Sequence, residues 1–361
     1  MLRVWLLPLP LFGALAVAAL AGGDEPRTGD VDAAVQRALG YLRQSQHRDG
    51  CWLANGFGSQ QSPGITGICV MAFLSAGHTP TEGPHAAALH QAIRWVMRNQ
   101  QRSGLISLGD SFDMYHHGIC TLMLAEVVGM TDGSLADELR QRLARAVELI
   151  LKAQRISGGG RGGWRYSAVG GDADLSVTGW QVLALRAAKD VGCDVPSSAI
   201  DRAIEYVRAC YDDGRGAFCY MPNNHLTVPC TGTGILCLEL AGKDFHRSPQ
   251  SLRAGGYILR NGPSLDQAHC FYGLYYCSQA MFQLGERYWE GYRQKMLDLL
   301  LPAQKTTGAW VGRDLEAQRA GPSYSTAMGV LALTVEYRLL PIYQRGDDNQ
   351  RTPSGNKDSS R

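Results

Sequence analysis

The chain has 361 residues, of which 45% are hydrophobic and 19% are charged, and it contains 43 glycines. A chain of this length can bury a large core in one big domain or two small ones. Its 35 basic and 33 acidic side chains nearly balance, which gives no electrostatic support for a nucleic-acid partner.

The first 21 residues have the pattern of a secretory signal peptide. One positive charge at Arg3 precedes an apolar run over residues 4–18, and an Ala-x-Ala exit follows at residues 19–21. The run is short and carries two prolines, which favours a cleaved signal over a retained membrane anchor. We therefore expect export to the periplasm or the extracellular space, with a polar linker over residues 22–30.

Ten cysteines in an exported chain raise the question of disulfides. Four of them lie inside apolar helical runs, where a free thiol behaves as a small buried hydrophobe: Cys69, Cys120, Cys237 and Cys277. Cys210 and Cys219 flank a turn, so they are the best candidates for one bridge.

A first pair of helices is expected after the linker. Residues 31–46 place apolar side chains at helical spacing and end in a Gln-Ser-Gln sequence, after which residues 49–52 form a glycine turn with Trp52. A shorter and more apolar helix then runs from Thr66 to Gly77.

This unit recurs along the chain. The five further copies each join an amphipathic helix to an apolar one through a turn, and the apolar helices begin near His117, Thr178, Thr231, Tyr272 and Ser325. Six helix–turn–helix units at a period of roughly 50 residues indicate a repeat architecture. The tail over residues 344–361 is rich in Arg, Asp, Asn and Ser and is expected to be disordered.

The two kinds of helix predict two layers. The first helix of each unit carries charges on one face, as an exposed helix does. The second is apolar nearly all round and rich in Gly and Ala, which suits close packing on several sides. We therefore expect residues 31–343 to form an all-α, α/α toroid (barrel), with an outer and an inner ring of helices. The parallel inner helices would direct their N-termini to one mouth.

Two of the turns resemble a known family. The sequences Gln154…Gly163-Trp164 and Gln304…Gly308-Ala309-Trp310 are similar to the Q-W repeats of squalene and hopene cyclases. The whole plan, over roughly residues 31 to 340, looks like the α/α toroid of terpenoid cyclases and protein prenyltransferase β subunits. Residues 275–285 and 337–343 resemble exported bacterial squalene-cyclase-like proteins of the prenyltransferase and squalene oxidase repeat type. The same toroid also serves complement-type domains and polysaccharide lyases.

An acidic segment carries the first candidate chemistry. Residues 172–176 resemble the D-x-D-D-T motif of hopene cyclases, which implies Asp174 as the proton donor and Asp172 as the outer acid. Leu175 replaces the third acid and Ser176 replaces the threonine. Such an acid needs a dry pocket that keeps one carboxyl protonated. The alternative is that Asp174 or Ser176 caps the inner helix.

A second segment suggests zinc. Residues 266–273 resemble the prenyltransferase segment that supplies a zinc-binding histidine, here His269, and the resemblance places Cys230 at the cysteine ligand. The carboxylate ligand is missing, because Val228 occupies its place. Cys230 and His269, with Cys270 as a third candidate ligand, would make a poor zinc site. The alternative is a polar residue at the rim of a pocket, with no cofactor bound.

A third group of polar residues precedes another inner helix. Asp110, Asp113, His116 and His117 lie at its start, so the toroid geometry directs them to the same mouth. A histidine beside carboxylates can act as a general acid or base. The alternative is a set of capping groups around an apolar pore.

Three functional hypotheses follow. The first is an isoprenoid-processing enzyme with Asp174 as general acid and a pocket that includes aromatics able to stabilise carbocations: Trp164, Tyr166, Trp180, Tyr272 and Tyr324, beside Asp113. The second is a non-catalytic toroid that binds an apolar lipid, a membrane surface or a protein. The third is an exported polysaccharide lyase or hydrolase acting through His116 and His117. A hydrophobic pore at Asp174 would favour the first, a pore filled by side chains the second, and an open polar cleft at His117 the third.

Overall fold

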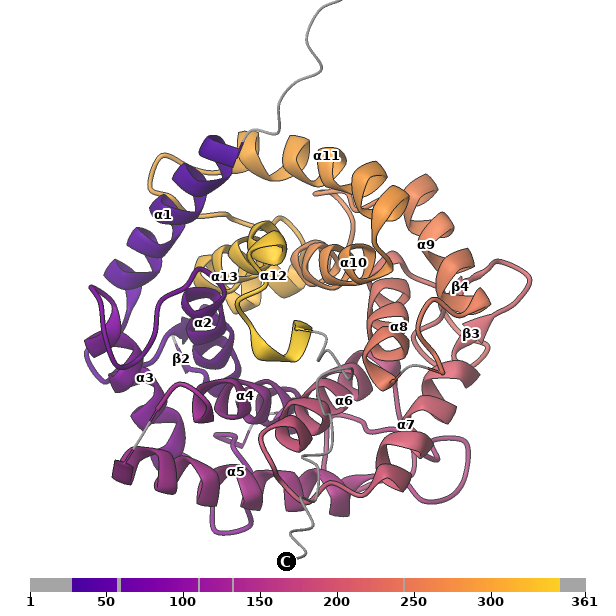
Figure 1. The fold of residues 1–361 in the computed structure, drawn as a ribbon, viewed down its shortest axis with the longest axis horizontal. Helices are drawn as coiled ribbons and strands as arrows, with labels where there is room; N and C mark the ends of the chain where they lie inside the picture. The colour runs from indigo at the N-terminus through magenta and orange to yellow at the C-terminus, as the bar shows by residue number, and fades with distance from the viewer. Residues whose placement is uncertain (1–27, 57–59, 110, 132, 243, 345–361) are drawn as a thin grey trace, which may run out of the picture.

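The computed structural model describes residues 28–56, 60–109, 111–131, 133–242 and 244–344. These residues form two concentric rings of helices (Figure 1). The inner ring consists of α2 (Pro63–Ser75), α4 (Asp113–Val128), α6 (Leu175–Asp190), α8 (Val228–Ala241), α10 (Cys270–Leu284) and α13 (Pro322–Leu333). The outer ring consists of α1 (Thr28–Ser45), α3 (Ala86–Arg98), α5 (Gly133–Ala153), α7 (Ser197–Ala209), α9 (Pro249–Asn261) and α11 (Glu286–Ala303).

Short elements complete the chain. Two antiparallel pairs join β1 (Leu53–Ala54) to β2 (Gln60–Gln61) and β3 (Tyr211–Asp212) to β4 (Ala217–Phe218), and three short helices are α12 (Leu315–Ala320), η1 (Thr334–Tyr337) and η2 (Pro341–Tyr343). Within the described part of the chain, no helix combines the length and apolarity needed to span a membrane. The predicted signal peptide and all but the first residue of the predicted tail lie outside the described residues.

Burial distinguishes the two rings as the sequence predicted. Every residue of α2 is buried, whereas α3 buries only seven of its 13 residues, along one stripe. Each inner helix contacts the next, and α13 contacts α2, so the inner ring is closed. The prediction of an all-α, α/α toroid of six helix pairs is confirmed.

The inner helices begin earlier than predicted. Helix α2 starts at Pro63 rather than Thr66, and α4 starts at Asp113 rather than His117. For α2, the reason is the side chain of Ser62, which accepts a hydrogen bond from the Ile65 amide and satisfies one of the free N–H groups of the first turn.

A glutamine at the end of four outer helices closes the outer ring. Its side-chain amide donates to the glycine carbonyl of its own turn and to a carbonyl of the next outer helix. In the last repeat, Gln304 Nε2 donates to Gly308 O at 3.0 Å and to Ala34 O of α1 at 2.8 Å. The other three members are Gln46, Gln100 and Gln154. The Q-W repeats therefore join neighbouring units through backbone carbonyls.

The turn tryptophans join the outer helix to the inner one. Trp164 Nε1 donates to Ile150 O of α5 at 2.8 Å, and the Trp164 amide donates to Thr178 Oγ1 of α6 at 3.1 Å. Trp52 and Trp310 repeat both bonds in their own units. Trp164 is fully buried, so in this structure it packs in the core of its repeat.

The end of the ring opposite the mouth is closed by the C-terminal turn η2. The Tyr343 hydroxyl contacts the Tyr275 hydroxyl of α10, and Gln283 Nε2 donates to Tyr343 O at 3.2 Å. The Ile342 amide donates to Glu126 Oε1 of α4 at 3.2 Å. These contacts hold η2 against two inner helices, α4 and α10.

All ten cysteines are free thiols in the structure. The bridge predicted between Cys210 and Cys219 is not formed, although the Cys219 amide donates to Cys210 O at 2.8 Å. This backbone bond continues the β3–β4 pairing and holds the two residues side by side without a covalent link.

Candidate functional site at the mouth of the toroid

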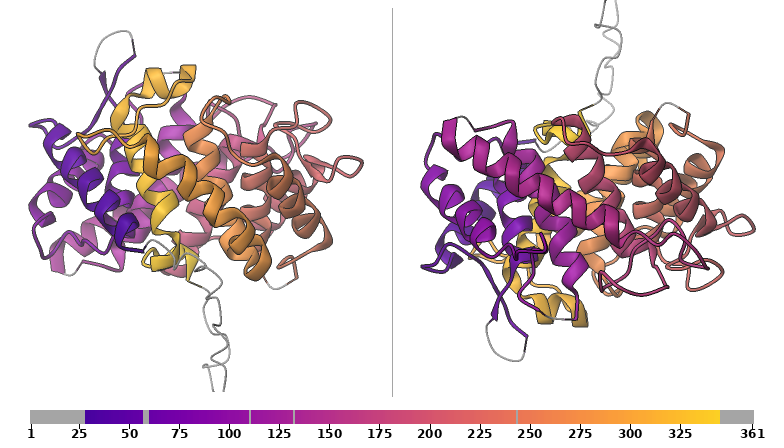
Figure 2. Two further views of the ribbon diagram at one scale, coloured as in Figure 1. Left: turned by 90° about the horizontal axis from the view of Figure 1, so that it is seen from above. Right: turned by 90° about the horizontal axis from the view of Figure 1, so that it is seen from below.

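The turns that lead from outer to inner helices lie on one face of the ring. Figure 2 shows α12 on this face and the short C-terminal helices near the other. Because the inner helices run parallel, their N-termini and the turns before them surround a single mouth. The candidate site is the set of side chains gathered there.

Asp174 lies at the centre of this set and is fully buried. Its Oδ1 accepts hydrogen bonds from the Ser176 hydroxyl at 2.6 Å and from the Val177 amide at 2.9 Å, so it caps α6. Its Oδ2 lies 3.3 Å from Arg165 Nε. Burial raises the pKa of the Asp174 carboxyl, while these two hydrogen bonds and the Arg165 charge act in the opposite direction.

Arg165 connects the acids to an aromatic surface. Its Nη1 lies 3.0 Å from Asp172 Oδ2, and Asp172 is exposed. The guanidinium lies 4.9 Å from the ring centroid of Tyr166 and 5.7 Å from that of Tyr220, within the range of cation–π attraction. The cation is therefore shared between two carboxylates and two rings.

Hydroxyl groups extend the site across the inner helices. The Tyr115 hydroxyl of α4 contacts Ser176 Oγ, and the Tyr272 hydroxyl of α10 lies 3.4 Å from Ser176 O and 2.9 Å from Thr233 Oγ1. Tyr115 and Tyr166 stack with ring centroids 5.9 Å apart. The structure thus places Asp174, Asp172, Tyr166 and Tyr272 in one group at the mouth.

A second polar group lies on the other side of the mouth. The Tyr324 hydroxyl donates to Glu316 Oε1 at 2.5 Å, and His269 Nδ1 contacts Glu316 Oε2. The hydrogen bond and negative charge of Glu316 raise the pKa of His269. Among the predicted pocket residues, Tyr324 therefore belongs to this group and not to the one around Asp174.

The structure does not assemble the predicted zinc ligands. His269 is paired with Glu316, and Cys230 is buried in the first turn of α8, where burial raises its pKa to about 12. Among the described side chains, no group of three or more His, Cys, Asp or Glu residues could hold a metal ion. His269 and Cys230 are therefore engaged separately and are not brought together as ligands of one metal ion.

His117 lies in the core and not at an open cleft, so that part of the prediction is wrong. Its Nδ1 accepts from the Ile106 amide at 3.1 Å, and its Nε2 lies 3.0 Å from Ala146 O of α5. Burial lowers its pKa to about 4. The neutral ring accepts from the turn amide as Thr178 does in the third repeat, and it also contacts α5, the outer helix of the next repeat.

The neighbours of His117 are also used locally. His116 Nδ1 accepts from the Gly64 amide at the start of α2 at 3.0 Å. Asp113 Oδ1 accepts from the Ser107 hydroxyl at 2.5 Å. Both side chains are half-buried at the mouth, where His116 contacts the start of α2 and Asp113 contacts the turn before α4. Asp110, the other acid of this predicted group, lies outside the described residues.

Sequence reasoning missed the residues that shape the third turn. The buried Arg155 guanidinium donates to a set of backbone carbonyls and so folds the loop over residues 155–174: Ala153, Ser167, Ala168, Val169 and Asp172. Arg165 and Tyr220 were missed as well. The sequence signal was the position of Arg165 between Trp164 and Tyr166, since an arginine beside aromatics is a common cation–π pair.

Exposed apolar side chains lie on the mouth face in three of the six connections between outer and inner helices. Among the described residues, six of the seven exposed large hydrophobic side chains lie in turns between an outer and an inner helix: Leu108, Phe112, Ile156, Val169, Val311 and Leu315. The seventh, Leu339, lies beyond η1. Phe112 packs edge-on against Tyr166, with centroids 5.3 Å apart, so this apolar rim is continuous with the aromatic surface inside the mouth.

Below the mouth, aromatic side chains fill the ring. Trp180 of α6 stacks on Tyr275 of α10 with centroids 5.4 Å apart and an interplanar angle of 8°. Tyr276 packs edge-on against both rings. All three are buried to within 1% of their surface. The predicted pocket residue Trp180 is thus a packing residue of the interior.

Comparison with known proteins supports the architecture. No protein-family model matches the chain, and no curated protein matches it. Among solved structures, the α-1,6-mannanase GH76A of Salegentibacter sp. HEL1_6 matches with a TM-score of 0.64 and 9% identity, over 86% of this chain and 99% of its own. The type II terpene cyclase MstE from Scytonema matches with a TM-score of 0.60 and 16% identity, over 87% of this chain and 100% of its own. The chain therefore has the α/α-toroid fold that it shares with a terpene cyclase and a mannanase.

Proposed function

We propose that the protein binds an apolar small molecule of the isoprenoid type at the mouth of its toroid. The observation that carries the proposal is the apolar rim, because exposed hydrophobic groups on a soluble domain mark interaction sites when they gather in one patch. The rim leads into the rings of Tyr115, Tyr166 and Tyr220. Aromatic faces of this kind contact a polyunsaturated hydrocarbon well.

The filled interior supports binding at the mouth over reaction in a deep chamber. Trp180, Tyr275 and Tyr276 occupy the space below Asp174, so a ligand would contact the turns and not the ring centre. One of the structures of the terpene cyclase MstE contains geranylgeranyl dihydroxybenzoate as substrate, which makes a geranylgeranyl chain a suitable first ligand to test.

The test is binding of geranylgeraniol to the purified protein, measured by microscale thermophoresis. Replacing Phe112 and Val169 by aspartate places two charges on the rim, and we expect the Kd to rise at least about tenfold, equivalent to about 1.4 kcal/mol. The matched control is Leu339→Asp, an exposed apolar position away from the mouth, which should leave the Kd unchanged. Absence of binding by the unaltered protein, or equal weakening by Leu339→Asp, would contradict the proposal. Binding to phospholipid vesicles but not to geranylgeraniol would replace the small molecule by a membrane surface.

Proton-initiated cyclisation is a second candidate function, favoured by the state of Asp174. Its carboxyl is buried, its pKa is raised, and its Oδ2 has no hydrogen-bond partner among the described residues. A carboxylic acid that stays protonated in a dry site can protonate an alkene. The Arg165 contact opposes this role, because a nearby cation favours the carboxylate.

The substitution Asp174→Asn removes the acid but keeps the helix cap, so it tests the two roles of Asp174 separately. Asparagine caps a helix about as well as aspartate, whereas Asp174→Ala is expected to cost about 1 to 2 kcal/mol of stability. If Asp174 is the acid, squalene or shorter polyprenes incubated with the protein give a cyclised product by gas chromatography–mass spectrometry, and Asp174→Asn gives none. If neither protein forms a product, Asp174 is the cap of α6 and the partner of Arg165. The buried, hydrogen-bonded His117 gives no comparable support to a polysaccharide-cleaving site.

A further inference from the structure

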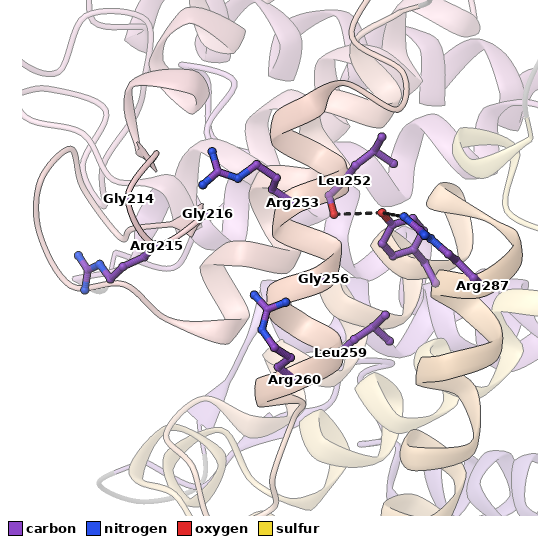
Figure 3. A pocket seen from close by; sticks show the side chains of 10 residues that line it. Gly214, Arg215, Gly216, Leu252, Arg253, Gly256, Leu259, Arg260 and Arg287 are labelled. Carbon is purple, nitrogen blue, oxygen red and sulfur yellow. Dashed lines mark hydrogen bonds between the residues drawn. The ribbon is translucent and has the colours of Figure 1, made fainter.

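A groove on the outer ring, away from the mouth, is lined by arginines. It measures about 570 Å³ and lies between α9, α11 and the turn that joins β3 to β4 (Figure 3). Four of its ten lining residues are arginines, from three different elements, and none is acidic: Arg215, Arg253, Arg260 and Arg287. A groove with this lining has a positive potential.

Two of the arginines are held in place by carboxylates behind them. Arg215 Nη2 lies 2.7 Å from Asp212 Oδ2, and Arg253 donates to the side chain and the carbonyl of Asp213 at 2.8 and 2.7 Å. These bonds restrict the rotamers of Arg215 and Arg253. The two side chains therefore lose little conformational entropy when a ligand binds.

The other two arginines form no ion pair with a carboxylate among the described side chains. They are Arg260 and Arg287, and both are exposed. Arg287 donates to the Tyr288 hydroxyl at 3.0 Å and lies 4.9 Å from the Tyr288 ring centroid. Tyr288 in turn donates to Leu252 O of α9 at 3.1 Å, which anchors this side of the groove to the helix (Figure 3).

A groove at the same place in the first repeat differs in charge. It also measures about 570 Å³ and contains Arg48, Arg94 and Arg98, but Asp49 lines it as well. Arg94 there is paired with Glu138 at 3.3 Å. The lining of the groove on α9 therefore has one more arginine and no carboxylate.

We propose that this groove binds an extended polyanion, namely an acidic polysaccharide with carboxylate or sulfate groups. Arg253 and Arg260 are seven residues apart on α9, two helical turns or about 10 Å along its axis, and Arg287 flanks them from α11. A single phosphate would need donors that converge on one point, whereas donors spread over this length match anionic groups repeated along a chain. The guanidinium fork binds a carboxylate or sulfate through two parallel hydrogen bonds.

The uncharged part of the lining suits a sugar chain. Gly256 in the middle of the groove has no side chain, and Arg260 Nη1 lies 3.4 Å from the place of its Cβ, so the guanidinium folds over the helix and faces the groove. Leu252 and Leu259 on either side offer apolar contacts to the faces of sugar rings. The chain as a whole has a formal net charge of only +2, which disfavours a nucleic acid as the ligand.

The experiment is binding to heparin, a sulfated probe, and to polygalacturonate, a carboxylated probe, by isothermal titration calorimetry. We expect the unaltered protein to bind at least one of them, and the one bound tighter identifies the anionic group. The double variant Arg260→Glu/Arg287→Glu should weaken that binding at least about tenfold. Both side chains are exposed, so its thermal unfolding should match that of the unaltered protein.

The matched control is Arg140→Glu/Arg145→Glu, which makes the same change in net charge at two exposed positions of α5. It should leave the affinity within about twofold. If attraction depended on net charge alone, the control and the groove variant would weaken binding equally. The proposal is overturned if neither polyanion binds, if the control weakens binding as much as the groove variant, or if duplex DNA binds as tightly as the polysaccharides.

Discussion

Gly162→Ala is expected to destabilise the protein by about 2 to 5 kcal/mol, the sum of a left-handed backbone and a steric clash. Gly162 has a φ of +91°, which side chains with a Cβ rarely adopt. A Cβ at this position would lie 2.0 Å from the carbonyl oxygen of Arg202 in α7. Because this oxygen belongs to a helix backbone, it cannot move without displacing the next outer helix.

Substitutions at two neighbouring glycines distinguish the backbone strain from the steric clash. Gly158 has a φ of +70° but open space where a Cβ would lie, so Gly158→Ala should cost only the backbone strain of about 1 to 2 kcal/mol. Gly159 has open space and no positive φ, so Gly159→Ala should change stability by less than about 0.5 kcal/mol. Urea unfolding of the three variants measures the order of their free energies of unfolding. A Gly162→Ala protein as stable as Gly159→Ala would show that the approach of the turn to α7 is not needed.

The same close approach explains why the fold could be predicted from the sequence. A left-handed glycine, an aromatic and a helix-ending glutamine recur because each turn must pass against the next outer helix. Gly308 shows this best, since its Cβ would lie 2.2 Å from Arg37 O of α1. This contact joins the last repeat to the first, and the ring closure follows from the repeat itself.

The helix starts and the role of His117 could not be predicted in the same way. A threonine accepts from the turn amide in four repeats, but in the second repeat a histidine does so and also contacts α5, the outer helix of the next repeat. The sequence shows a titratable residue where only a hydrogen-bond acceptor and donor are needed. Burial, which lowers the pKa of His117 to about 4, is visible only once the helices are packed.

The candidate site was predicted in part for a similar reason. Asp174 was identified from its own motif, and both its capping role and its burial are found. Its partners come from elsewhere: Tyr115 from α4, Tyr220 from the turn before α8, and Tyr272 from α10. The spacing along the chain contains no information on which of several aromatic residues will meet at the mouth.

The buried carboxyl of Glu126 makes the second large prediction, a fall in stability with rising pH. Glu126 lies on α4 and is 1% exposed, and its Oε1 accepts from the Ile342 amide. Its Oε2 has no hydrogen-bond partner among the described residues. Burial, followed by the charge of Asp190, raises the Glu126 pKa to about 8, against the hydrogen bond from Ile342. The hydroxyls of Tyr275 and Tyr343 lie nearby and remain neutral, because burial raises the pKa of both.

The direction of the effect follows from proton binding in the two states. Between about pH 4.5 and pH 8 the folded protein holds the Glu126 proton while the unfolded chain has released it. Since the folded state holds the Glu126 proton in this window, the contribution of Glu126 to the free energy of unfolding falls as the pH rises and levels off above pH 8. The lowered pKa of the buried His117 contributes in the opposite direction between about pH 4 and pH 6.5. At about 1.4 kcal/mol per pKa unit, the Glu126 contribution is roughly 4 to 5 kcal/mol.

Glu126→Gln should remove this slope. Glutamine keeps an acceptor for the Ile342 amide and cannot ionise, so the variant should match the unaltered protein at pH 4.5 and be more stable by on the order of 3 to 4 kcal/mol at pH 9. Urea unfolding at pH 4.5, 7 and 9 measures it, with the fully exposed Glu148→Gln as the control that should not change the slope. The raised pKa of Asp174 also lowers the free energy of unfolding as the pH rises. The contribution of Glu126 is therefore the difference in unfolding free energy between Glu126→Gln and the unaltered protein. Equal slopes in Glu126→Gln and the unaltered protein would contradict the prediction and assign the pH dependence to other buried groups.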